Sequence, residues 1–127
     1  MKLEDVEKRV LEEIKKHNLK GWKFEWLGRR KNYRRIGDCC VRTKVIRIQP
    51  IYVELYLDEV IINTILHEIA HALTPNSGHN KFWKRKAIEI GCDGRRQSNL
   101  KGKKIINNQF KKYCENTKRK IRRYFIR

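Results

Sequence analysis

Three histidines in one short stretch constrain the fold of this chain more than any other feature. The stretch HEIAHALTPNSGH, residues 67–79, holds three of the four histidines in a sequence of 127 residues. Residues 58–73 around it carry apolar side chains at helical spacing, which predicts an amphipathic helix. Side chains four positions apart share one helix face, so His67 and His71 can bind one ion together. The helix must therefore turn its apolar stripe to a core and its histidines to a groove.

The same stretch carries the residues that a catalytic metal site needs. Glu68 lies beside the two histidines in the H-E-x-x-H pattern, in which the glutamate acts as general base on a water molecule. Catalytic zinc has three protein ligands and an open fourth position. His79 follows a helix-ending proline and glycine, where a reversal of the chain can return it to the ion. The sequence predicts Zn²⁺ bound by His67, His71 and His79, with Glu68 as catalytic base.

Other interpretations of these residues stay open at this stage. A cysteine thiolate is also a good zinc ligand, so Cys92, or Cys39 or Cys40, could replace His79. A structural zinc site would be closed by four ligands, and the chain would then be a nucleic-acid-binding module without catalysis. A zinc hydrolase that acts on another small substrate is a third possibility.

Two motifs in order resemble a known family. The segment TILHEIAHALTPNSGHNKFWKRKAIEIG (residues 64–91) resembles the core of the SprT-like metalloproteases, the group that includes Spartan. Members carry H-E-x-x-H-A on a helix and then a third histidine in a "GH…F" segment, which Gly78, His79 and Phe82 match. The upstream RIGDCCVRTKVIRIQPIYVE resembles the hairpin before the active-site helix, so the resemblance covers about residues 36–91.

The resemblance implies a small zincin-like fold, a zinc ion on His67, His71 and His79, and Glu68 as base. It also implies proteolysis of proteins trapped on DNA, stimulated by DNA. Two departures concern the C-terminal half. Many members have a zinc ribbon with paired C-x-x-C motifs, whereas Cys114 stands alone here, and Asn80 occupies a position where glycine is frequent.

Further segments with helical or strand periodicity define the fold class. They are helices over residues 3–18, 58–73 and 80–91 and strands over residues 22–26, 36–41 and 44–49. We expect an α+β fold, with a short, mostly antiparallel sheet packed on the active-site helix. The zincin domain is expected to span residues 1–100, and residues 101–127 to form a basic extension.

Several details of the cleft also follow from the sequence. Residues 46–49 fit either an edge strand that pairs with an extended substrate or an ordinary internal strand. An oxyanion donor besides zinc is expected, with Tyr33, Tyr52, His17 and several arginines as candidates. The buried side of the helix over 80–91 is expected to consist of Phe82, Trp83, Ala87 and Ile90.

The charge of the chain indicates a polyanionic partner. There are 32 Lys and Arg against 14 Asp and Glu, a net charge of +18. Residues 101–127 hold eleven Lys or Arg and one acid, with aromatic residues between them, as in grooves that bind single strands. Alternatively, the apolar residues of this tail dock on the core. We expect sequence-independent DNA contacts from Arg29, Arg30, Lys31, Arg34, Arg35, Lys118, Arg119, Lys120, Arg122 and Arg123.

The remaining expectations concern partners and location. The expected substrate is a protein bound to DNA, and the expected state is a monomer that does not bind membranes. No stretch approaches the ~20 apolar residues of a membrane span, and MKLEDVEKRV lacks the apolar core of a signal peptide. An intracellular location follows as an expectation: nucleoid or cytoplasm, or the nucleus in a eukaryotic host. The cysteines are then expected to be reduced.

Overall fold

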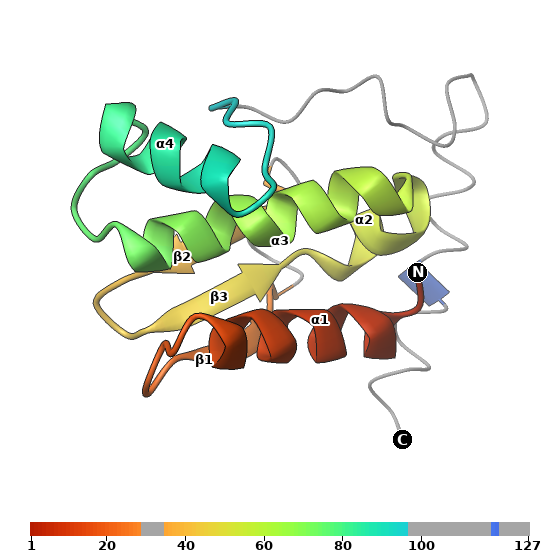
Figure 1. Ribbon diagram of the computed structural model, residues 1–127. Coiled ribbons are helices and arrows are strands. Elements are labelled where there is room, and N and C mark those ends of the chain that lie inside the picture. Colours follow the sequence, from red (N-terminus) through yellow and green to blue (C-terminus); the bar gives the residue numbers. More distant parts are fainter. Residues whose placement is uncertain (29–34, 97–117, 120–127) are drawn as a thin grey trace.

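A three-stranded sheet with helices packed against it forms the described part of the chain (Figure 1). The computed structural model describes residues 1–28, 35–96 and 118–119. The elements are α1 (Leu3–Lys16), β1 (Lys23–Trp26), β2 (Gly37–Cys40), β3 (Val45–Ile48), α2 (Pro50–Leu55), α3 (Asp58–Leu73) and α4 (Lys81–Glu89). The α+β class and the helices and strands expected from the periodicity are confirmed, with ends that differ by a few residues.

The order of the strands decides which one borders the site. The order is β1-β3-β2, so β3 is the central strand of the sheet formed by the described residues. β3 pairs parallel with β1, Phe24 opposite Ile46, and antiparallel with β2, Cys39 opposite Ile46. The sheet is therefore mixed, and antiparallel pairing holds only for β2 and β3. Residues 46–48 belong to this internal strand and not to an edge, because both neighbours of β3 take up its backbone hydrogen bonds. Gln49 follows the strand as the N-cap residue of α2.

The core lies between one face of the sheet and two helices. Ile46 and Ile48 of β3 are fully buried, and α1 packs on β1 while α3 packs on β2. Both helices present their apolar stripes to these residues, Val6 and Val10 from α1 and Ile61, Ile65 and Ile69 from α3. Helix α4 packs on α3 and lies above it in Figure 1. The stripe of α3 thus faces the sheet core, which leaves its histidine face free for the cleft.

Helix α2 is not predicted by the sequence pattern. The pattern marks Pro50 only as the end of the preceding strand, but it occupies the first turn of α2, where its missing N–H costs nothing. The helix is short and carries Tyr52, with Tyr56 one turn later at its end. The rings of Tyr52 and Tyr56 stack with centroids 5.0 Å apart. This turn therefore brings an aromatic pair to the wall of the cleft.

Helix α4 buries fewer residues than its pattern predicts. Trp83 and Ala87, one turn apart, are buried against α3 in a small cluster with Cys92, and Ile90 is half-buried. Phe82, predicted on the buried side, is 56% exposed, with the Lys81 ammonium 5.5 Å from its ring centroid. The turn that starts α4 directs Trp83 inward and the residue before it outward.

Within residues 1–28, 35–96 and 118–119, each helix is too short or too polar to span a bilayer.

Candidate metal centre

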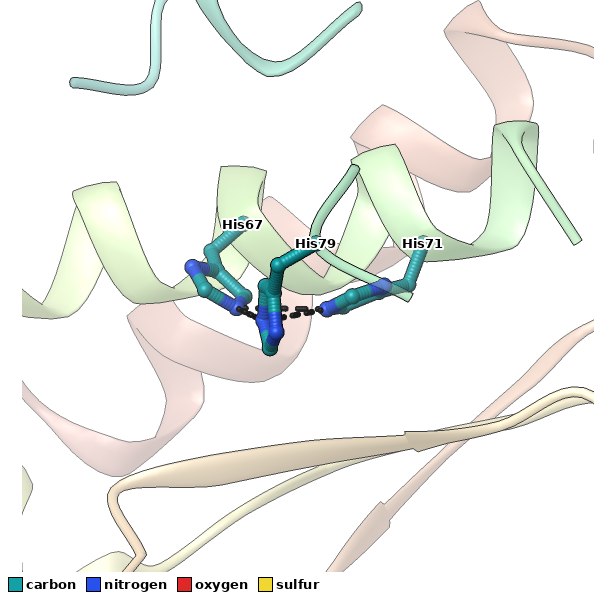
Figure 2. A group of neighbouring side chains, drawn as sticks. All are labelled: His67, His71 and His79. Atoms are coloured by element: carbon teal, nitrogen blue, oxygen red, sulfur yellow. Dashed lines mark hydrogen bonds between the residues drawn. The ribbon is translucent and has the colours of Figure 1, made fainter. Parts of the chain in front are cut away.

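Three imidazoles converge beside α3. The Nε2 atoms lie 3.1 Å apart for His67 and His79, 3.1 Å for His71 and His79, and 3.3 Å for His67 and His71 (Figure 2). Zinc binds histidine nitrogen at about 2.0–2.1 Å in tetrahedral geometry, which places two such nitrogens about 3.3 Å from each other. The three nitrogens thus have the spacing of three ligands on one tetrahedral ion. Among the described residues, they form the one cluster suited to hold a metal ion.

Local structure explains how three residues from two segments meet. His67 and His71 are one turn apart on α3, and His79 returns to them through the loop after Leu73. Asn76 and Gly78 take left-handed backbone conformations, with φ of 64° and 55°, which reverse the chain. The Asn80 side chain then caps α4 by accepting hydrogen bonds from the backbone N–H of residues 82 and 83, at 3.0 and 3.2 Å. Asn80 therefore acts as the N-cap of the helix that follows His79.

The imidazoles are held in the neutral form that binds metals. Burial, followed by the charges of neighbouring histidines, lowers the pKa of His67 and of His71 to about 4. Burial and then the positive charge of Arg96 lower the pKa of His79. A neutral imidazole keeps the lone pair that a metal ligand donates. The site therefore needs to lose no protons from its histidines at neutral pH when an ion binds.

Trp83 supports all three rings, a role that no spacing pattern in the sequence predicts. Its ring centroid lies 4.6, 5.1 and 4.7 Å from those of His67, His71 and His79, and it stacks on His71. Its indole N–H donates to the backbone carbonyl of His67 at 3.3 Å. The backbone of Arg95 also lies near the His67 imidazole and acts against the burial that lowers the pKa of this ring. Such partners set ring orientation and tautomer in metal sites.

Glu68 lies buried beside the three imidazoles. Its side chain is 8% exposed, and its Oε1 is 3.9 Å from Nε2 of His67. Burial, and after it the negative charge of Asp38, raises its pKa to about 8, while Arg35 opposes that shift. In the metal-free site the carboxyl is therefore mainly protonated at neutral pH, and a nearby dication would favour the carboxylate.

A cleft of about 800 Å³ opens at this site. Its walls come from α3, from β2, from the tyrosine pair, and from Arg35, Arg95 and Arg96. Gly37 lets β2 approach α3 closely. A Cβ at that position would lie 3.0 Å from the Arg47 carbonyl oxygen and 3.1 Å from Cγ2 of Thr64. The strand that borders the cleft is therefore β2, which pairs on one side with β3.

The cysteines considered as third ligands lie outside the metal cluster. Cys92 is 5% exposed between α3 and α4, and burial raises the pKa of its thiol. Cys39 lines the cleft, but burial and then Glu68 raise its pKa to about 12, so it stays a thiol, whereas zinc binds thiolate. Cys40 follows it on the opposite face of β2. Cys114 lies outside the described residues.

Other predicted site residues are placed as follows. Arg35 lines the cleft, and Lys118 and Arg119 are helical, with Arg119 exposed. Tyr52 also lines the cleft, whereas His17 follows α1, with its Nε2 3.2 Å from Glu13 and outside the cleft wall. The predicted DNA contacts outside the described residues are Arg29, Arg30, Lys31, Arg34, Lys120, Arg122 and Arg123, and Tyr33 lies there too.

The SprT-like family model matches residues 3–105. The chain belongs to the SprT-like family. A solved structure with a similar fold is the metallopeptidase zymogen of Methanocaldococcus jannaschii jannalysin, with a TM-score of 0.55 and 16% sequence identity. The match covers 94% of this chain and 96% of that one, and at this identity it shows the fold alone. No curated protein matches the sequence. The zincin-like fold and the family suggested by the two motifs are thereby confirmed.

Proposed function

We propose that this SprT-like chain is a zinc-dependent endopeptidase that cleaves proteins held on DNA. One observation carries the peptidase part. Three neutral imidazoles stand at the separations of a tetrahedral ion, beside a buried carboxylate, in an open cleft. Three nitrogen ligands with a free fourth position are typical of catalytic zinc, and four closed positions are typical of structural zinc. No fourth His, Cys, Asp or Glu of the described residues joins the cluster.

In this mechanism the three histidines bind the metal ion and Glu68 transfers protons. His67, His71 and His79 would hold Zn²⁺ and, being neutral, leave its charge uncompensated. When bound, zinc supplies Lewis acidity, which polarises a carbonyl and lowers the pKa of water from 15.7 toward ~7. Glu68 is the only carboxylate beside the cluster with an oxygen within 4 Å of a ligand nitrogen in the described part of the chain. It accepts the proton of the attacking water and delivers it to the leaving amine.

The cleft wall orients the substrate. β2 has one edge paired with β3, and the cleft is on the side where β2 meets α3. An extended peptide can bind to the other edge through backbone hydrogen bonds, which fixes its path without requiring a particular sequence. Gly37 keeps this strand close enough to α3 for such a peptide to lie over Glu68.

The DNA part of the proposal rests on charge and on the family. The net charge of +18 favours a polyanion, and the eleven Lys and Arg of residues 101–127 are enough for several phosphate contacts. DNA bound by this chain would concentrate DNA-associated proteins near the zinc site and would thereby stimulate their cleavage.

A cleavage assay with a matched control tests the proposal. The zinc-loaded protein is incubated with a DNA-binding protein, with and without DNA, alongside Glu68→Gln and Glu12→Gln. Glu12 is an exposed residue of α1 outside the cleft wall. Loss of a general base typically lowers the rate about 10²–10⁴-fold, so Glu68→Gln should keep zinc and lose cleavage, whereas Glu12→Gln should behave as the parent.

The outcomes separate the two parts of the proposal. Cleavage that survives in Glu68→Gln would reject the assigned mechanism. Cleavage by the parent that is the same with and without DNA would reject the DNA part and leave a basic zinc peptidase. Zinc that binds without any cleavage would favour the module with a structural site.

A further inference from the structure

Three arginines form the charged rim of the cleft. Arg35 precedes β2, and Arg95 and Arg96 follow α4, so the rim is assembled from segments about sixty residues apart. All three residues are exposed and line the cleft. Within the described residues, no carboxylate forms an ion pair with any of their guanidinium groups. In this part of the chain, the rim therefore presents positive charge to the cleft that no ion pair neutralises.

The two acidic side chains that line the cleft, Glu68 and Asp38, have contacts other than ion pairs with these arginines. Glu68 is buried beside the histidines. Asp38 accepts two hydrogen bonds from the Arg47 guanidinium, at 2.7 and 2.8 Å, which is the bidentate geometry that holds such a pair firmly. Apart from the arginines, these two acidic groups and the neutral imidazoles, the side chains that line the cleft are uncharged. A zinc ion would add two further positive charges to this wall.

We propose that the cleft selects acidic peptide segments, with substrate carboxylates near the scissile bond bound by Arg35 at the β2 side and by Arg95 and Arg96 at the α4 side. Guanidinium groups bind carboxylates through paired hydrogen bonds, and partial exclusion of water in a cleft strengthens them. This inference rests on the proposed peptidase function and names the substrate class of the same site.

A peptide is favoured over DNA as the partner of this rim because of where the rim lies. The cleft that holds the three histidines and Glu68 is the same cleft that the arginines line. The segment to be cleaved must occupy it, so its own side chains meet the arginines during the reaction. A nucleic-acid strand on the same guanidinium groups would compete with the substrate for this space.

The test uses three fluorogenic peptides with the same core, flanked on both sides by Asp, by Asn or by Lys. The zinc-loaded full chain is compared with Arg95→Glu/Arg96→Glu, with Arg35→Glu, and with Lys84→Glu/Arg85→Glu. The last variant makes the same charge change as the first on exposed residues of α4 outside the cleft wall. Zinc content and thermal unfolding are measured for each, because the Arg95 backbone supports His67.

We expect the parent to have kcat/KM about tenfold higher for the Asp peptide than for the Asn peptide, as two or three partly exposed ion pairs would provide. The preference should shrink at high salt. It should be lost or reversed toward Lys in Arg95→Glu/Arg96→Glu and reduced in Arg35→Glu, and it should persist in Lys84→Glu/Arg85→Glu.

Equal cleavage of the Asp and Asn peptides by the parent would overturn the inference and leave the peptidase function standing. The inference also fails if the rim variants keep the acidic preference and instead bind a DNA oligonucleotide more weakly, since the rim would then be a phosphate contact. If the zinc-loaded parent cleaves none of the peptides or proteins offered, the proposed function fails and this inference with it.

Discussion

Removal of the charge from Glu68 should change how stability depends on pH in the metal-free protein. The carboxyl has a pKa of about 8 in the folded state, chiefly because of burial, against 4.5 for the unperturbed group. A raised pKa means that the folded state favours the protonated form. The stabilisation is therefore fully present below pH 4.5 and is lost as the pH rises through 8.

The size of the effect follows from this shift. Relative to the fully protonated group, ionisation of Glu68 lowers the free energy of unfolding by about 1 kcal/mol at pH 5 and about 4 kcal/mol at pH 8. Glutamine has nearly the same volume and no charge to lose. Glu68→Gln should therefore be the more stable protein at pH 8, and its advantage over the parent should grow by about 3 kcal/mol between pH 5 and pH 8.

Urea unfolding of the chelated proteins at several pH values measures this difference. His67 and His71, whose pKa values are lowered to about 4, make both proteins less stable as the pH falls from 6.5 toward 4. Because both proteins share these histidines, their effect cancels in the difference between the two curves. Glu12→Gln should follow the parent. Parallel curves for the parent and Glu68→Gln would refute the placement of Glu68 as a buried, desolvated base.

Three further predictions concern the ligands, the cleft wall and the tail. His79→Ala should lose most bound zinc, and Cys92→Ser should keep it, as measured by metal analysis; the opposite result would reject the ligand assignment. Gly37→Ala should lower the free energy of unfolding by about 1–3 kcal/mol in urea, because the added methyl group meets the backbone of β3 and the side chain of Thr64; an unchanged midpoint would contradict that close approach. Glutamine in place of Lys118, Arg119, Lys120, Arg122 and Arg123 should flatten the salt dependence of DNA binding, by about 0.9 in slope for each phosphate that these side chains no longer neutralise; an unchanged slope would remove the tail from the DNA surface.

The sequence pattern was sufficient to predict those elements whose formation depends only on residues close together in the chain. The apolar spacing of residues 58–73 predicted α3, and helical geometry alone placed His67, His71 and Glu68 on adjoining positions. The helix-ending turn and the cap at Asn80 also act within a few residues, so the return of His79 was predictable. Pro50 shows the limit of such reasoning, because it suits the end of a strand and the start of a helix equally well.

Contacts between distant segments decided the rest. A metal-binding helix, a hairpin and flanking helices could be predicted from the sequence, since each depends on residues within a turn or two. The tertiary structure made β3 the central strand and left β2 as the wall of the cleft. The reason is that β1 pairs in parallel with β3, about twenty residues later in the chain, and not with β2, the next strand in sequence. The tertiary structure also set Trp83 against all three imidazoles and brought Arg95 and Arg96 to the same cleft as Arg35. These placements depend on how separate elements bury their apolar faces against one another. The periodicity of apolar residues within one segment predicts that segment's own structure but not its neighbours in the fold.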